Sequence, residues 1–247
     1  MKININMKKS FTFFLISSLL IPFVFGCAPK TYRAHPEFEQ RVKSITHPGM
    51  LPSDVKVYEL TAGGVQELRD DWCKIGKENV EKSIHEAFKQ RPFTVEQLLV
   101  DKEIEEEIED IQTLYRAVSL SIQLHTYNPQ FMFPEKTKNF IYSVGPVDKI
   151  LKKYGADALI FVYGFDGIST GGRKALMAAG IIVGAFTGVM IAPREGITAV
   201  SIALVDSSGT ILWYNLKASA GGKDLRDFDS CSSMINNIVA EFPTPTK

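Results

Sequence analysis

Apolar residues recur at helical spacing in two long stretches of this chain. After Asp70, apolar or small residues follow one another at steps of four, at Trp72, Gly76, Val80, Ile84 and Phe88. A second stripe of about five turns contains Ile104, Ile108, Ile111, Tyr115, Val118 and Ile122. Because residues three or four apart share one face of an α-helix, both stretches predict amphipathic helices that cover a core with one side.

Shorter apolar runs predict strands, at residues 55–60, 93–95, 156–163, 198–205 and 210–217. The run 156–163 is apolar on both faces except at Asp157, which is typical of a central strand covered on both sides. The last two runs flank the sequence Asp206-Ser207-Ser208-Gly209, which favours a turn. We therefore expect these two strands to form an antiparallel hairpin.

Two shorter helices complete the pattern. Pro146 is a suitable first residue for one of them, and Gly155 is a suitable residue to end it. The last helix runs from about Asp229 and turns its apolar residues inward, namely Cys231, Met234, Ile235 and Ile238. The resulting order, β-α-β-α-α-β-insert-β-β-α, predicts an α/β (α+β) fold in which helices pack on a mixed β-sheet.

The first 27 residues have the pattern of a bacterial secretory signal. Lys2, Lys8 and Lys9 precede an apolar stretch of 15 residues from Phe11 to Phe25. At about 1.5 Å per residue, this stretch is too short to span a bilayer core of about 30 Å. We therefore interpret it as a cleaved signal peptide rather than a transmembrane helix.

The signal ends in Val24-Phe25-Gly26-Cys27, which resembles the bacterial lipobox. In proteins with that motif, the cysteine sulfur carries a diacylglycerol and the new amino terminus carries an acyl chain; several chains anchor a protein firmly. The resemblance implies covalent lipid at Cys27, and no other cofactor is expected. Because Ala28 rather than Asp follows the cysteine, we expect the mature chain in the outer membrane, facing the periplasm.

These features predict how the chain is organised. We expect a signal peptide at 1–26, a lipidated tether at 27–53, one α/β domain at 54–240 and a tail at 241–247. The domain contains an apolar, glycine-rich insert at 173–192. Removing 26 residues from 247 leaves 221, which is enough for one domain.

The centre of the insert, residues 175–192, carries no charge, and Gly180, Gly184 and Gly188 repeat within it at intervals of four. Glycines so spaced lie on one helix face and let another backbone approach closely. Three interpretations stay open. The segment is buried in its own domain, inserts into the outer membrane with a reach of about 27 Å, or packs against its copies in a homo-oligomer.

The charge balance argues against nucleic acid as a partner. The chain has 28 basic and 28 acidic residues, and the signal removes three lysines, so the mature chain carries 25 − 28 = −3. Proteins that bind nucleic acid need a basic patch, and no block of Lys and Arg supplies one.

Two cysteines, Cys73 and Cys231, remain after Cys27. An exported protein enters an oxidising compartment, so a disulfide between them is permitted. Two buried thiols are the alternative. Two separated cysteines without clustered histidines do not form a zinc site.

No motif in the chain indicates catalysis. Ser53-x-x-Lys56 has a serine/lysine spacing, but no accompanying motif is present. Asp224, Asp227 and Asp229 precede the last helix, where we expect N-capping rather than calcium binding. We therefore expect a protein that is not an enzyme.

Two further segments carry a resemblance to a known family. Gly155-Ala156-Asp157-Ala158 leads into the apolar strand, and Leu204-Val205-Asp206 is followed by Gly209 and by Ile211-Leu212-Trp213. Together with the lipobox, they resemble bacterial outer-membrane lipoproteins related in fold to the N-terminal domain of TolB and to the curli-secretion lipoprotein CsgG. The resemblance covers about residues 54–240.

This resemblance implies a role in the cell envelope, with outer-membrane lipid and other envelope proteins as partners. The expected function is that of a non-catalytic assembly or partner-binding module in the periplasm. In CsgG-like proteins, inserted hairpins line a multimeric pore. The alternative is therefore an oligomeric pore or secretion-channel subunit that uses residues 175–192 in the outer membrane.

Overall fold

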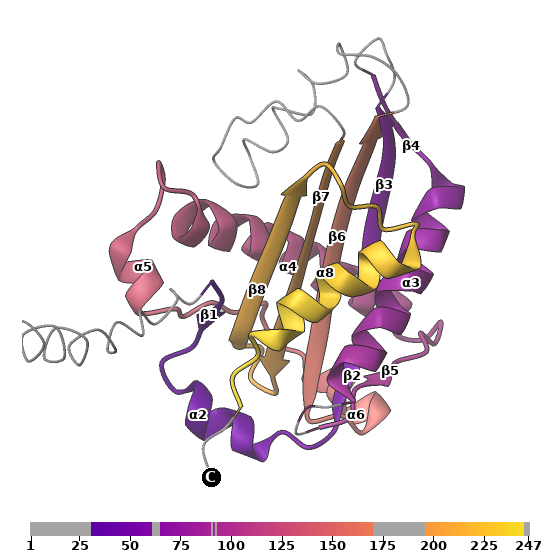
Figure 1. The fold of residues 1–247 in the computed structure, drawn as a ribbon. Coiled ribbons are helices and arrows are strands. Elements are labelled where there is room, and N and C mark those ends of the chain that lie inside the picture. The colour runs from indigo at the N-terminus through magenta and orange to yellow at the C-terminus, as the bar shows by residue number, and fades with distance from the viewer. Residues whose placement is uncertain (1–30, 61–64, 90, 92, 170–195, 245–247) are drawn as a thin grey trace, which may run out of the picture. The chain divides into compact units, whose positions relative to one another are not determined.

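The computed structural model describes residues 31–244, apart from residues 61–64, 90, 92 and 170–195 (Figure 1). Its strands are β1 (Arg33–Ala34), β2 (Pro48–Met50), β3 (Asp54–Leu60), β4 (Gln66–Leu68), β5 (Glu96–Gln97), β6 (Ala158–Ser169), β7 (Gly196–Asp206) and β8 (Ile211–Ala220). Its longer helices are α3 (Asp70–Phe88), α4 (Glu105–Ile122), α6 (Asp148–Tyr154) and α8 (Phe228–Ala240). Shorter helical turns are α2 (Phe38–Arg41), η1 (Val42–Ser44), η2 (Gln123–Tyr127) and α5 (Pro134–Lys138).

Strand β6 is the centre of an eight-stranded mixed sheet, as the apolar run at 156–163 predicts. On one edge it pairs antiparallel with β7, and β8 and β1 continue the sheet antiparallel beyond β7. On the other edge, β2 pairs parallel with residues 158–160 of β6, and β3 pairs parallel with residues 163–169. Strands β5 and β4 lie outside β2 and β3, respectively.

Helices cover both faces of this sheet. Helices α3 and α8 pack together over one face (Figure 1), and α4 and α6 contribute to the core on the other face. Side chains of β6 alternate between the two cores: Ile160 and Val162 pack under α3 and α8, while Leu159 and Phe161 pack under α4. The α/β fold with helices on a mixed sheet is therefore confirmed.

The two long amphipathic helices lie where the sequence predicts them. Helix α3 buries Gly76, Val80, Ile84 and Phe88, and α4 buries Ile108, Ile111, Tyr115 and Ile122. Helix α6 ends at Gly155, which is left-handed with φ 66°, but the helix begins at Asp148 rather than at Pro146.

The hairpin of β7 and β8 is also confirmed. The amide of Gly209 donates to the carbonyl of Asp206 at 2.9 Å and closes the turn. The strand expected at 93–95 is wrong by a few residues, because the pairing with β2 involves Glu96 and Gln97. Phe93 and Val95 instead place their side chains in the core beneath α3.

The tether expected at 27–53 is too long. The folded unit begins at Thr31. Residues 33–34 pair with β8, residues 48–50 pair with β6, and Phe38 and Val42 are buried in the core beneath α8. Strands of two or three residues have no readable periodicity, so only their partners in the sheet reveal them.

The expected domain end at 240 and tail at 241–247 also need correction. Phe242 lies beyond α8 but is only 2 % exposed. Its ring makes edge-on contacts with those of Phe38, Phe88 and Phe93, at centroid distances of 5.6 to 5.9 Å. The first residues of the tail therefore belong to the core. The insert at 173–192 lies outside the described residues.

Gly209 gives a direct test of this fold. Its φ is +77°, and a Cβ there would lie 1.8 Å from the carbonyl oxygen of Gly145. We expect Gly209→Ala to lower the free energy of unfolding by more than about 3 kcal/mol, because left-handed strain adds to a backbone clash.

Gly155→Ala is the matched control. Its φ is +66°, but nothing lies within 4 Å of the added Cβ, so strain alone should cost about 1–2 kcal/mol. Urea unfolding followed by circular dichroism measures both variants. Equal losses would contradict the described turn.

Candidate functional site

A buried carboxyl group, Asp166, lies near the end of the central strand. It is 1 % exposed and faces α3 and α8, and its β7 partner in the ladder is Thr198. The ladder continues to the pair Ile168 and Gly196. Residues 170–195, which contain the glycine-rich insert, connect these two strands. Asp166 therefore lies at the base of that connection.

Hydrogen bonds fix both carboxyl oxygens of Asp166. Oδ2 accepts from the amide of Leu225 at 2.8 Å, and Oδ1 lies 2.9 Å from the hydroxyl of Thr198. The same hydroxyl lies 2.9 Å from the carbonyl oxygen of Lys223. A hydroxyl has one proton, so Thr198 can donate to only one of these two oxygens.

A proton on Asp166 gives every atom of this group a partner. Protonated Oδ1 donates to Thr198, and Thr198 then donates to the carbonyl of Lys223. Burial raises the pKa of Asp166 to about 7, even though the bonds from Leu225 and Thr198 act in the opposite direction. Hydrogen-bond accounting and desolvation therefore both favour the neutral acid.

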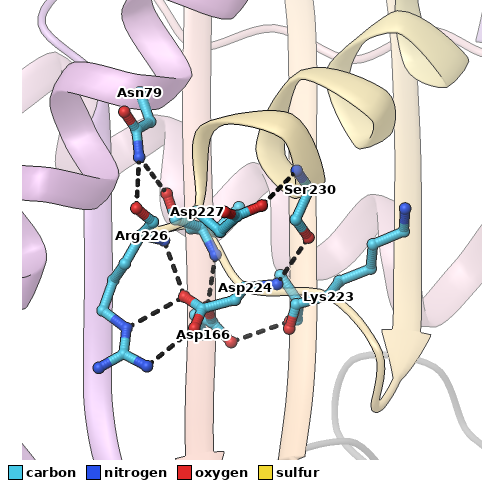
Figure 2. Close-up of polar contacts among 9 residues, drawn as sticks. Asn79, Asp166, Lys223, Asp224, Arg226, Asp227 and Ser230 are labelled. Atoms are coloured by element: carbon cyan, nitrogen blue, oxygen red, sulfur yellow. Dashed lines mark hydrogen bonds and ion pairs between the residues drawn. The ribbon is translucent and has the colours of Figure 1, made fainter.

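Leu225, whose amide bonds to Asp166, belongs to the segment 223–227, which precedes α8 (Figure 2). From α3, the amide of Asn79 donates to the carbonyls of Leu225 and Arg226 at 3.0 and 2.8 Å. The amide of Asp224 donates to the hydroxyl of Ser230 at 2.9 Å. The segment is thus bonded to β6, β7, α3 and α8 together.

Leu225 occupies the space between these elements and is fully buried. Two glycines make that space. A Cβ at Gly76 of α3 would lie 3.2 Å from side chains of Val55 and Val57, and one at Gly164 of β6 would lie 3.4 Å from Leu225. The small residue that the helical pattern placed at 76 therefore lets α3 approach the sheet.

Charged and aromatic groups lie beside the segment 223–227. Arg226 pairs with Asp224 at 2.8 Å, and its guanidinium lies 4.1 Å from the ring centroid of Trp72. Arg69 lies 4.5 Å from the same ring and pairs with Glu59. Arg226 is thus held by Asp224 and Trp72, and the ion pair it forms is not with Asp166.

This arrangement suits a structural joint better than a reaction centre. Asp166 has almost no exposed surface, so a substrate has no access to its carboxyl oxygens. Its hydrogen bonds attach the segment before α8 to the two strands from which residues 170–195 depart. We name this group, Asp166, Thr198, Lys223 and Leu225, the strand–helix joint.

The residues that the sequence singles out do not meet in one place. Cys27, Gly180, Gly184 and Gly188 lie outside the described residues. Cys73 and Cys231 are both free thiols, so the disulfide permitted by the sequence is not formed in this structure. Cys73 accepts from the amide of Val57 at 3.2 Å. Burial raises the pKa of Cys231 to about 11, which keeps its sulfur protonated.

The expected N-capping is confirmed at Asp227, whose side chain accepts from the amide of Ser230. Within the described part of the chain, no group of three or more His, Cys, Asp or Glu side chains is placed to hold a metal ion. In the same part, no helix is both long enough and apolar enough to cross a bilayer.

A cavity of about 380 Å³ lies elsewhere, beside the start of β2. His47, Glu96 and Tyr154 contribute polar groups to its wall. Asp157 fixes one side of it, because its carboxylate accepts from the amides of Thr46 and His47 at 2.7 to 3.0 Å. The one polar residue of the predicted central strand thus holds the start of β2.

Sequence reasoning missed the joint. Asp166 follows the apolar run that ends at Tyr163, and its partners lie 32 and 59 residues further along the chain. The available signal was an isolated acid between Phe165 and Gly167 in an extended strand.

No known family model and no curated protein sequence matches the chain.

The joint predicts an unusual dependence of stability on pH. An unfolded aspartate ionises near 3.8, whereas the folded carboxyl does so at about 7. Folding therefore takes up a proton between these values, and stability falls as pH rises from about 4 to about 7. Asp166→Asn keeps a donor toward Thr198 and an acceptor toward Leu225 but removes the titration.

We expect the free energy of unfolding of the wild type, relative to Asp166→Asn, to fall by up to about 1.4 kcal/mol per pH unit between about pH 5 and pH 7. The comparison is needed because burial also lowers the pKa of His35. That shift makes stability rise with pH, and it cancels because both proteins contain His35. Urea titrations at several pH values measure the free energy of unfolding of both proteins. If the two plots of this free energy against pH run parallel, Asp166 is charged in the folded protein.

Proposed function

We propose that this chain is a lipid-anchored lipoprotein of the bacterial outer membrane. It faces the periplasm and acts as a non-catalytic assembly or partner-binding module. The observation that carries the proposal is the lipobox-like ending at Cys27, which lies only four residues before the folded unit begins at Thr31. At about 3.6 Å per residue, that linker keeps Thr31 within about 14 Å of a lipidated cysteine.

The buried joint supports a non-catalytic role. Its polar groups bond to one another and leave no exposed acid for chemistry. The joint instead fixes the strands on both sides of residues 170–195. An apolar segment held at both ends is suited to pack against another protein or against copies of this chain, and Gly180, Gly184 and Gly188 offer the closest approach.

One observation favours the pore or secretion-channel alternative. Strands β6 and β7 stay paired in register up to Ile168 and Gly196, so residues 170–195 connect the arms of one antiparallel hairpin. Inserted hairpins form the channel in the CsgG-like proteins that this sequence resembles. A channel requires a ring of subunits, whereas a partner-binding module does not.

The anchor is tested by Cys27→Ala in cells fed a labelled fatty acid. We expect the wild type to incorporate the label and Cys27→Ala to lose it entirely, because only the thiolate of this cysteine accepts the diacylglycerol. Cys73→Ala is the matched control and should keep the label. A wild type without label would refute the proposal.

The glycine series is tested by Gly184→Leu. We expect this change to weaken assembly or partner binding while secretion and lipidation stay normal, because a large side chain prevents close backbone approach. Ile182→Leu, in the same segment but outside the series, is the control. Crosslinking in whole cells followed by size analysis measures the complex; identical patterns would remove the glycines from the account.

A further inference from the structure

The segment between Asn128 and Tyr142 exposes an unusual number of large apolar side chains. Phe131, Met132 and Phe133 are consecutive and are 58 %, 42 % and 54 % exposed, and Ile141 is 58 % exposed. Three consecutive exposed apolar residues are a liability in water unless they have a function. We name Phe131, Met132, Phe133 and Ile141 the apolar loop.

The apolar loop is tied to the first residues of the folded unit. The guanidinium of Arg33, in β1, donates to the carbonyl of Thr126 and lies 4.3 Å from the ring centroid of Tyr127. One residue before Thr126, the carbonyl of His125 accepts from the amide of Phe133 at 2.9 Å. Strand β1 forms the edge of the sheet next to β8, and α5, which follows Phe133, lies on the same side of the sheet (Figure 1).

The length of chain before Arg33 limits how far the loop can be from a lipid anchor. Arg33 lies six positions after Cys27, a span of at most about 22 Å in a fully extended chain. That distance is less than the thickness of a bilayer core, about 30 Å. A lipid on Cys27 therefore keeps Arg33 within about 22 Å of the anchor, and Arg33 contacts Thr126 and Tyr127 in the segment that leads into the apolar loop.

The composition of the loop region fits a bilayer interface. Aromatic side chains and Met suit the boundary between headgroups and acyl chains. Lys136 and Lys138 follow Phe133 in α5, so two cations lie close to the apolar residues along the chain, as suits contact with lipid phosphate groups. Glu135 is the acid among them, and Lys138 pairs with it at 3.7 Å.

We propose that the apolar loop rests in the phospholipid surface to which Cys27 anchors the chain, and so fixes which face of the domain is turned toward the membrane. This inference rests on the proposed lipidation of Cys27. Two attachments, one covalent and one through side chains, orient a domain, whereas a flexible linker alone leaves it free to rotate.

Tryptophan placed in the loop tests the inference. The mature lipidated chain carrying Phe131→Trp or Phe133→Trp is reconstituted into vesicles of phosphatidylethanolamine and phosphatidylglycerol with brominated acyl chains, which quench nearby indoles. Leu99→Trp is the control, since Leu99 is 82 % exposed and lies beside β5, on the opposite edge of the sheet. The emission of Trp72 and Trp213 is subtracted with the parent protein.

We expect blue-shifted and quenched emission at 131 and 133, and unshifted, unquenched emission at 99. Position 131 is the more direct probe, because Phe133 packs on the ring of His125 at a centroid distance of 4.8 Å. Replacing Phe133 changes that contact, whereas replacing Phe131 leaves it in place. Vesicle-bound protein without quenching at 131 would overturn the inference and leave the anchor intact. Equal quenching at 99 and 131 would also overturn it. Protein that neither floats with vesicles nor carries an acyl mass would overturn the proposed function and the inference with it.

Discussion

The burial of one carboxyl group in the middle of the sheet constrains the rest of this fold. Asp166 lies on the central strand, where a charge would be costly, and its two oxygens are bonded to Thr198 and Leu225. Because those partners lie on β7 and before α8, the bonds join strands and helix at one point. The packing of Leu225 beside α3 and β6 depends on the same segment.

The joint on the central strands and β1 at the sheet edge have different roles in the proposed function. The joint fixes the base of residues 170–195, which we propose for assembly. Strand β1 forms one edge of the sheet and begins six positions after the cysteine that we propose as the anchor. A domain held at the membrane by one edge, with its apolar connection fixed by buried bonds, is a suitable module for presenting that connection to partners in the envelope.

The parts of this fold that depend on local pattern could be predicted from the sequence. Helices α3 and α4, strand β6 and the hairpin of β7 and β8 have runs long enough to show a period. Strands β1 and β2 do not, because two or three residues carry no period and form only by pairing with β8 and β6. Asp166 was missed for a related reason, since its partners are distant in the chain and a carboxyl in a strand is usually exposed.

The protonation of Asp166 can be observed directly through the ¹³C resonance of its carboxyl carbon, assigned by comparison with Asp166→Asn. If Asp166 is neutral and donates to Thr198, its carboxyl carbon has the chemical shift of a neutral acid at about pH 5. The resonance then titrates with a midpoint near pH 7. A carboxylate shift throughout that range would contradict the account. Thr198 could then donate to only one of Asp166 Oδ1 and the Lys223 carbonyl, and the joint would need another explanation.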